Sequence, residues 1–133
     1  MAFVDDILQL RTRCRISEEI GREYELSEKE IVCISALGDS GSVHSKTLSD
    51  SIGLSPSRGS RIIGRLMDRG FLECVPDPAD RRYVNVRLTD QGNECLSTIE
   101  RRKNECEKRL LAGLTERERN KVREGIGLLL EVI

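Results

Sequence analysis

Residues 55–92, SPSRGSRIIGRLMDRGFLECVPDPADRRYVNVRLTDQG, decide the fold of this chain. The stretch opens with Ser55 and Pro56, a pair typical of a helix N-cap followed by the first helical residue. It predicts a helix over 56–69 that stops at Gly70. At about 100° per residue, one arc of roughly 80° collects the arginines of this helix, which are Arg58, Arg61, Arg65 and Arg69. A neighbouring, wider arc is apolar, so one face can pack against a core while the other presents guanidinium groups.

A β-hairpin is predicted directly after this helix. Residues 71–75 form one short β candidate, and residues 83–88 alternate polar and apolar side chains with the period of a half-buried strand. The connector, PDPADRR at 76–82, is rich in turn residues and contains two prolines, which cannot donate to a strand ladder. We therefore expect the tip of the hairpin to project into solvent.

A shorter helix is predicted just upstream, from Ser45 or Lys46 to Ile52. Gly53 suits the left-handed position that ends a helix. Only residues 53–55 then separate two helices, which is the helix-turn-helix arrangement.

The rest of the chain predicts further helices, each from a cap or an apolar stripe. They are a helix over 4–24, a helix that begins with the capping box at 27–30 and ends near Gly38, a long helix capped by Thr89 that reaches about Leu111, and a last helix that begins with the capping box at 115–118. The segment GDSGSVHS at 38–45 is expected to be a loop. The predicted fold class is mainly α with a small β-hairpin wing, a winged helix-turn-helix flanked by N- and C-terminal helices.

Composition indicates one small domain with a modest core. The chain has 133 residues, of which 38% are hydrophobic, 34% are charged and only 3% are aromatic. Such a chain buries few large side chains on its own, and oligomerisation is a usual remedy. The net charge of −1 conceals a local imbalance, because residues 1–54 carry six Lys/Arg against ten Asp/Glu while residues 55–90 carry seven against five. Positive charge is therefore concentrated in the arginine helix and the hairpin.

Secretion, membrane insertion, metal binding and catalysis are not expected. The start MAFVDDILQL does not resemble a signal peptide and no apolar run approaches a transmembrane length, so we expect a cytoplasmic protein with no membrane partner. The five cysteines include no CxxC pair and accompany a single histidine, so we expect no metal. No phosphate-binding glycine loop or partnered nucleophile is present, so we expect neither an enzyme nor a cofactor. Cys14, between two arginines, is the best candidate for a redox-sensitive thiol, although a structural role is expected for the cysteines as a set.

The arginine helix and the hairpin together suit DNA. A helix fits the major groove and reads base edges with its N-terminal residues, which are Ser57, Arg58, Ser60 and Arg61. Gly59 would let the backbone approach closely, and Arg65 and Arg69 lie where phosphate contacts are expected. At the hairpin tip, Arg82, next to Arg81, could enter a narrow minor groove while Asp80 holds a guanidinium in place. Each feature alone could instead be a solvated charged surface, but together they reinforce each other.

This part of the sequence resembles the winged helix-turn-helix of the MarR family of bacterial and archaeal transcription regulators. The matching residues are Leu48, Ile52-Gly53-Leu54-Ser55, the run 61–70 with Leu66 and Gly70, Asp77-Pro78, Asp80-Arg81-Arg82, and Leu88-Thr89 with Gly92. The resemblance is strong over about residues 45–95 and rests elsewhere on the order and length of the helices.

The resemblance implies a homodimer with intertwined N- and C-terminal helices that binds a palindromic operator in double-stranded DNA. It implies that Arg82 enters the minor groove with Asp80 as its support. It also implies a regulator, usually a repressor, that a small-molecule effector or an oxidant releases. Residues 1–133 would then form a single domain, with a DNA-binding part at 27–90 and dimerisation helices at 1–26 and 91–133. The alternative function is a winged-helix protein-interaction module that binds no operator, for which the acidic first third leaves room.

Overall fold

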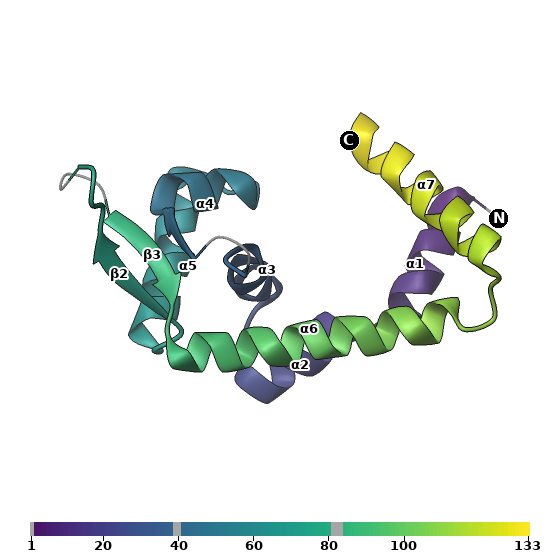
Figure 1. The fold of residues 1–133 in the computed structure, drawn as a ribbon, viewed down its shortest axis with the longest axis horizontal. Helices are drawn as coiled ribbons and strands as arrows, with labels where there is room; N and C mark the ends of the chain where they lie inside the picture. The colour runs from purple at the N-terminus through teal and green to yellow at the C-terminus, as the bar shows by residue number, and fades with distance from the viewer. Residues whose placement is uncertain (1, 39–40, 81–83) are drawn as a thin grey trace. The chain divides into compact units, whose positions relative to one another are not determined.

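The chain forms two compact units, residues 1–102 and residues 103–133. The computed structural model describes residues 2–38, 41–80 and 84–133. In chain order the elements are α1 (Phe3–Arg13), α2 (Ile16–Tyr24), α3 (Glu28–Ala36), β1 (Ser42–His44), α4 (Ser45–Ser51), α5 (Pro56–Asp68), β2 (Leu72–Pro76), β3 (Val84–Leu88), α6 (Asp90–Leu111) and α7 (Glu116–Val132) (Figure 1). The predicted fold class, mainly helical with a small antiparallel sheet as a wing, is confirmed.

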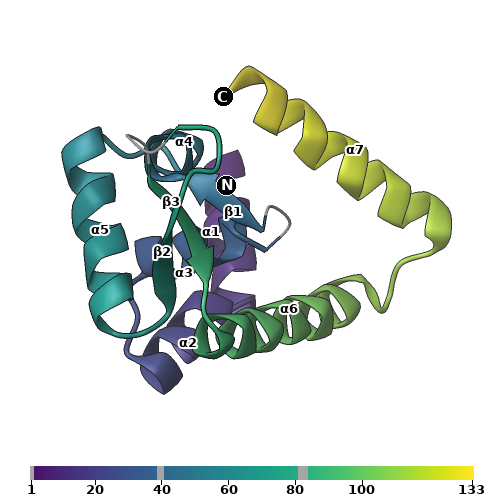
Figure 2. The ribbon, with the colours of Figure 1, turned by 60° about the vertical axis from the view of Figure 1, so that its left-hand side comes forward.

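The sheet has three antiparallel strands in the order β1-β3-β2 (Figure 2). The predicted hairpin is confirmed, with Leu72 opposite Leu88 and Pro76 opposite Val84. Strand β1 lies in the segment that we expected to be a loop, and it pairs with β3 through Val43 opposite Val86. Three residues are too few to give a periodic signal in the sequence, so pairing with β3 is what makes this segment a strand.

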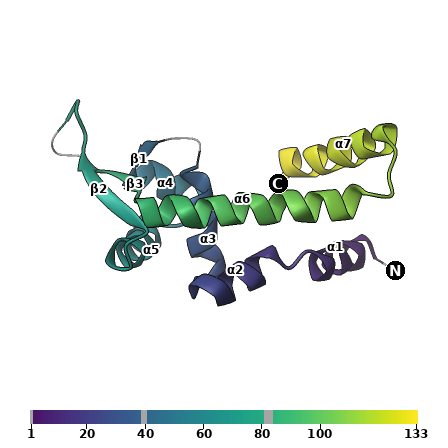
Figure 3. The same ribbon diagram turned by 60° about the horizontal axis from the view of Figure 1, so that its bottom comes forward.

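The prediction of one continuous N-terminal helix is wrong, because the chain breaks between α1 and α2. Cys14 has extended backbone angles (φ −120°, ψ 92°), and no side chain caps the start of α2. In an unbroken helix the apolar stripe of α1 would point roughly 150° away from that of α2. The break lets Ile16, Ile20 and Tyr24 of α2 pack on the core, whereas α1 buries none of its residues. Figure 3 shows α2 alongside the first part of α6.

One hydrophobic core holds the first unit together. Its most deeply buried side chains come from helices α2 to α6 and from the sheet, and include Ile20, Ile34, Leu37, Leu48, Leu66, Val86 and Ile99. Most are aliphatic, as the low aromatic content requires, and Phe71 adds a buried ring. The helix-turn-helix and the wing therefore share a single core.

Hydrogen bonds confirm the predicted helix starts. Ser27 and Glu30 form a reciprocal capping box at α3, with N···O distances of 3.0 and 3.2 Å. Thr115 and Glu118 form the same box at α7. At α5, the hydroxyl of Ser55 accepts from the backbone N–H three residues later at 3.3 Å. Each cap satisfies backbone groups that the helix itself leaves unpaired.

The exit from the wing into α6 depends on close backbone approach. Gly70 has φ +84°, a backbone angle that is unfavourable for residues other than glycine. The N–H of Thr89 donates to the carbonyl of Phe71 at 3.1 Å, and its hydroxyl accepts from the N–H of Gly92 at 3.1 Å. A Cβ on Gly92 would overlap the Phe71 carbonyl oxygen. The Leu-Thr-x-x-Gly pattern is thus required by how α6 starts against the end of α5.

Apolar side chains remain exposed in both units. In the first unit α1 exposes Phe3, Val4, Ile7, Leu8 and Leu10, each between 44% and 59%. In the second unit the exposed set is Leu110, Val122, Ile126, Leu128, Leu129, Leu130, Val132 and Ile133. No helix among the described residues is both long and apolar enough to span a bilayer.

Candidate nucleic-acid interface

The helix-turn-helix is closed by a tight turn between α4 and α5. Gly53 has φ +72°, and the N–H of Leu54 returns to the carbonyl of Ser49 at 3.0 Å. Pro56 then starts α5 in the position where a missing N–H costs least. The predicted turn over 53–55 is confirmed.

Gly59 is buried against α4, so our expectation that it brings the α5 backbone close to DNA is wrong. A Cβ at this position would lie 2.5 Å from the Cβ of Ser49, and closer still to its hydroxyl oxygen. Ser49 is itself buried, and its hydroxyl donates to the carbonyl of Ser45 at 3.0 Å. The glycine therefore sets the distance between the two helices of the motif.

The N-terminal half of α5 carries the exposed cations that the sequence predicted. Among the α5 residues predicted to contact DNA, Ser57, Arg58, Ser60, Arg61 and Arg65 are exposed on the outward face. Three of them border a hollow of about 260 Å³ whose lining residues are Lys29, Leu54, Arg58, Arg61, Ile62 and Arg65. Lys29 belongs to α3, and sequence reasoning missed it because only the packing of α3 beside α5 brings it to this face. The hollow combines four positive side chains with an apolar floor, which suits a phosphate-bearing ligand.

Ser57 and Arg65 have partners within the protein. The hydroxyl of Ser57 lies 3.4 Å from that of the capping residue Ser55. A guanidinium nitrogen of Arg65 lies 3.9 Å from a carboxylate oxygen of Glu30, whose side chain is only 7% exposed while that of Arg65 is 58% exposed. Glu30 therefore partly offsets the charge of Arg65.

Arg69 does not join the outward row, because its guanidinium is bonded within the protein, and the phosphate contact expected for it stays a prediction. Its guanidinium donates to the backbone carbonyls of Tyr24 and Glu25, at 2.5 and 2.6 Å. The guanidinium carbon also lies 5.2 Å from the centre of the Phe71 ring. The helical wheel gave the direction in which the side chain leaves α5, but a long side chain at the end of a helix can reach carbonyls of a neighbouring element.

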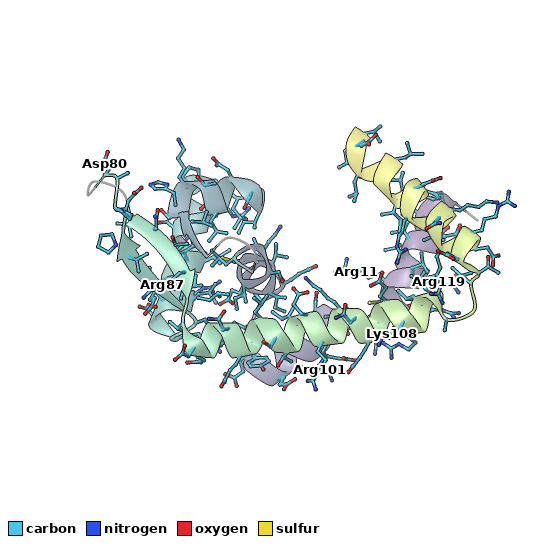
Figure 4. The ribbon with its side chains drawn as sticks, viewed as in Figure 1. Arg11, Asp80, Arg87, Arg101, Lys108 and Arg119 are labelled. Atoms are coloured by element: carbon cyan, nitrogen blue, oxygen red, sulfur yellow. The ribbon has the colours of Figure 1, made fainter. Side chains whose placement is uncertain are left out.

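The wing is a hairpin with charged groups along it. Arg87 and Glu73 are directly opposite on β3 and β2 and form an ion pair at 2.7 Å. Figure 4 shows Arg87 on the sheet and Asp80 near the tip. The Asp77 carboxylate accepts from the N–H of Ala79 at 2.9 Å, which folds the start of the tip. The wing arginines, Arg81 and Arg82, lie outside the described residues, so their contacts and the supporting role of Asp80 stay predictions.

The cysteines differ in environment. Burial, with a smaller effect of the Glu30 charge, raises the pKa of Cys33 to about 12. Burial also raises the pKa of Cys95 to about 11. Cys74 is exposed on β2 and its sulfur lies 3.0 Å from that of Met67. Cys14 is half-buried at the break between α1 and α2, and its role as a redox sensor stays a prediction. Among the described residues, no group of three or more His, Cys, Asp or Glu side chains could hold a metal ion.

Comparison with known proteins identifies the family. Residues 26–84, from the end of α2 to the start of β3, match the model of the MarR family. This segment, which holds the helix-turn-helix and the start of the wing, is a MarR-family segment. The whole chain is similar to the HTH-type transcriptional regulator PecS of Dickeya dadantii, with 27% identity over 134 residues that cover 93% of this chain and 81% of PecS.

Solved structures share the same fold over nearly the whole chain. The reduced form of MarR from E. coli superposes with a TM-score of 0.77 at 19% identity and covers 98% of this chain and 97% of that one. FabT of Streptococcus pneumoniae, in complex with DNA, superposes with a TM-score of 0.83 at 19% identity and covers 97% and 94%. The winged helix-turn-helix described above is thus the MarR-family fold.

Proposed function

We propose that this protein is a DNA-binding transcriptional regulator that acts as a homodimer on a palindromic operator, most simply as a repressor. The observation that carries the proposal is the exposed arginine pair Arg58 and Arg61 at the start of α5, beside a hollow lined by further cations. The match of residues 26–84 to the MarR family model supports it, and so does the structural similarity to FabT, which was solved in complex with DNA.

In this proposal α5 enters the major groove. Ser57, Arg58, Ser60 and Arg61 lie in its first two turns, where side chains of a recognition helix reach base edges. Arginine can pair bidentately with guanine, and each good pair contributes about 1–3 kcal/mol of discrimination. Arg65 and the α3 residue Lys29 flank these positions and would contact phosphates.

The wing would read the adjacent minor groove. Arg82, with Arg81 beside it, is assigned to this groove, where negative potential is strongest when the groove is narrow. Asp80 would orient a guanidinium and not touch DNA, since a carboxylate is repelled by phosphate. The paired strands β2 and β3 would carry these residues out to the groove.

The homodimer is proposed from the apolar surfaces that the two units leave exposed. Large apolar side chains left exposed in number on one helix, as on α1 and on α7, usually mark a site of association. The N-terminal segment 1–26 contains α1, and the segment 91–133 contains most of α6 and all of α7, so both would serve dimerisation around the DNA-binding part at 27–90. We assign the protein to the cytoplasm, and propose that a small ligand or an oxidant acting on Cys14 could release it from DNA.

The test is a selection from random duplexes followed by titration. The selection should return an inverted repeat with half-site centres about 10 bp, or one helical turn, apart. Arg61→Ala should weaken operator binding by about 1–3 kcal/mol and relax the preference at one base position. Arg65→Ala should weaken all sequences alike, and Arg82→Ala should weaken operator binding at moderate salt.

Arg101→Ala is the matched control, because this exposed arginine lies on α6 away from the proposed interface (Figure 4). It should leave affinity close to that of the unchanged protein. A selection that returns no inverted repeat would instead favour the protein-interaction module. Unchanged affinity in Arg82→Ala would remove the wing assignment while leaving the α5 assignment intact.

A further inference from the structure

Arg69 links the C-terminal end of α5, the helix proposed to enter the major groove, to the C-terminal end of α2. It is the C-cap residue of α5, and its guanidinium donates to the carbonyls of Tyr24 and Glu25 at the end of α2. These carbonyls are among the last of α2, which have no partner within that helix. Glu25 has φ +56°, a left-handed value that is uncommon for a residue with a side chain, and this turn directs its carbonyl toward Arg69.

Helix α2 is in turn fastened to α6. Arg102 of α6 forms ion pairs with Glu19 at 3.0 Å and with Glu23 at 2.5 Å. The hydroxyl of Tyr24 donates to that of Thr98 on α6 at 2.9 Å. Polar contacts thus run from α5 through Arg69 to α2, and from α2 to the first part of α6.

A ring contact strengthens the same junction. The Arg69 guanidinium lies over Phe71, and the Tyr24 ring meets Phe71 edge-on with centroids 6.4 Å apart. Phe71 is buried at the point where α5 passes into the wing. Arg69, at the end of α5, therefore contacts both the start of the wing and the end of α2.

We propose that Arg69 is a positioning residue that sets the orientation of α5 by capping α2, and that it makes no contact with DNA. The inference rests on the proposed function for its meaning, but its geometry does not depend on DNA. Two of the five guanidinium N–H groups already donate to backbone carbonyls at the end of α2, which fixes the direction of the side chain along that helix end. An altered orientation of α5 would weaken base contacts in the groove while leaving the number of neutralised phosphates unchanged.

The first experiment uses the free protein and two variants, Arg69→Ala and Arg69→Lys. Hydrogen exchange of the backbone over residues 20–26 should become about tenfold faster in Arg69→Ala, because the end of α2 loses its cap. Arg69→Lys should give a smaller increase, since one ammonium cannot reproduce the two-pronged contact. Exchange that is unchanged in both variants would overturn the cap, whatever the outcome with DNA.

The second experiment compares affinity for the selected operator with affinity for random-sequence duplex across a range of salt. Arg69→Ala should lower the ratio of the two affinities about tenfold while the slope of log K against log salt stays that of the unchanged protein. Arg61→Ala is the matched control on the same helix and should reduce that slope by about one if it also reaches phosphate, or alter base preference if it does not. A merely destabilising role would lower the melting temperature without changing the affinity ratio of the folded protein.

A slope reduced by about one in Arg69→Ala, with both affinities lowered alike, would identify Arg69 as a phosphate contact and overturn the proposal. If Arg69→Ala does not fold, Arg69→Lys carries the test, because lysine would preserve a phosphate contact but only part of a two-carbonyl cap. Failure of the unchanged protein to select any operator would refute the proposed function and leave the exchange result standing.

Discussion

Replacing Gly59 with alanine should destabilise this protein, although alanine is the better helix former. Gly59 lies inside α5 and faces Ser49 of α4, where the two helices of the motif meet. An added Cβ would lie 2.5 Å from the Cβ of Ser49, whereas carbon atoms in good contact are about 3.5–4.0 Å apart. Both atoms are attached directly to helix backbones, so no side-chain rotation relieves the overlap and the helices must separate by about 1 Å.

The magnitude follows from two opposing effects. Overpacking of this kind costs about 1–3 kcal/mol, and a clash between two fixed Cβ atoms belongs at the upper end. Alanine gains about 1 kcal/mol over glycine in a helix interior. The net loss in free energy of unfolding should be about 2 kcal/mol. Gly64 is the matched control, because it lies in the same helix and a Cβ there meets nothing within 4 Å, so Gly64→Ala should gain up to about 1 kcal/mol.

The assay is urea denaturation at one fixed protein concentration, with Ser49→Gly completing a double-mutant cycle. Ser49→Gly removes the atoms that clash, so the double variant should be more stable than the sum of the two single losses by about 3 kcal/mol, the full cost of the clash. The reasoning would be refuted if the Gly59→Ala variant had the same free energy of unfolding as the Gly64→Ala variant. So would strict additivity in the cycle, because it would mean that the two residues do not meet.

Three further predictions concern the wing exit, the thiols and the last helix. Gly92→Ala should lower the free energy of unfolding by about 3 kcal/mol, measured by urea denaturation, because the added Cβ meets a backbone carbonyl that cannot rotate away. At pH 8 a maleimide should label Cys74 in the folded protein and Cys33 only after unfolding. Burial raises the pKa of Cys33 to about 12, so the contribution of this thiol to the free energy of unfolding is full below about pH 9 and is lost as pH rises through 12. The backbone N–H and then the hydroxyl of Thr115 lower the pKa of Glu118, so Thr115→Ala should raise that pKa part of the way in a carboxyl NMR titration.

Each of these has a clear contrary result. A Gly92→Ala protein as stable as the unchanged one would mean that α6 starts elsewhere. Equal labelling of the buried and exposed thiols at pH 8 would contradict the burial of Cys33. No change in the Glu118 titration would mean that the Thr115 hydroxyl does not stabilise the charged form of the Glu118 carboxylate.

The sequence was most informative where the determining interactions are local. The helix starts at Ser55, Ser27 and Thr115 were predicted correctly because each cap joins residues three apart. The left-handed conformation of Gly53 was predicted correctly because a glycine directly after a short helix commonly takes it. The hairpin was predicted because alternation over 83–88 is a property of neighbouring residues.

What the sequence could not give depends on partners distant in the chain. Strand β1 exists through its pairing with β3, more than forty residues away. Gly59 was read as an opening toward DNA because its neighbour Ser49 is on another helix. Arg69 was read from its angle on a helical wheel, which says nothing of the α2 carbonyls at its reach. Lys29 joins the basic hollow only once α3 has packed beside α5.

Strand β1 also has a mechanical consequence. His44 ends β1, and its Nδ1 accepts from the N–H of Lys46 at 3.2 Å, so the strand passes into α4 with no flexible joint. Because β1 is paired with β3, the fold fixes the orientation of the helix-turn-helix relative to the wing within one subunit. A signal that controls this protein therefore has little scope to change that orientation within one subunit. We expect it to change the separation of the two DNA-binding parts in the proposed homodimer. Such a change would alter which half-site spacing is bound, and would leave the half-site sequence that is read unchanged.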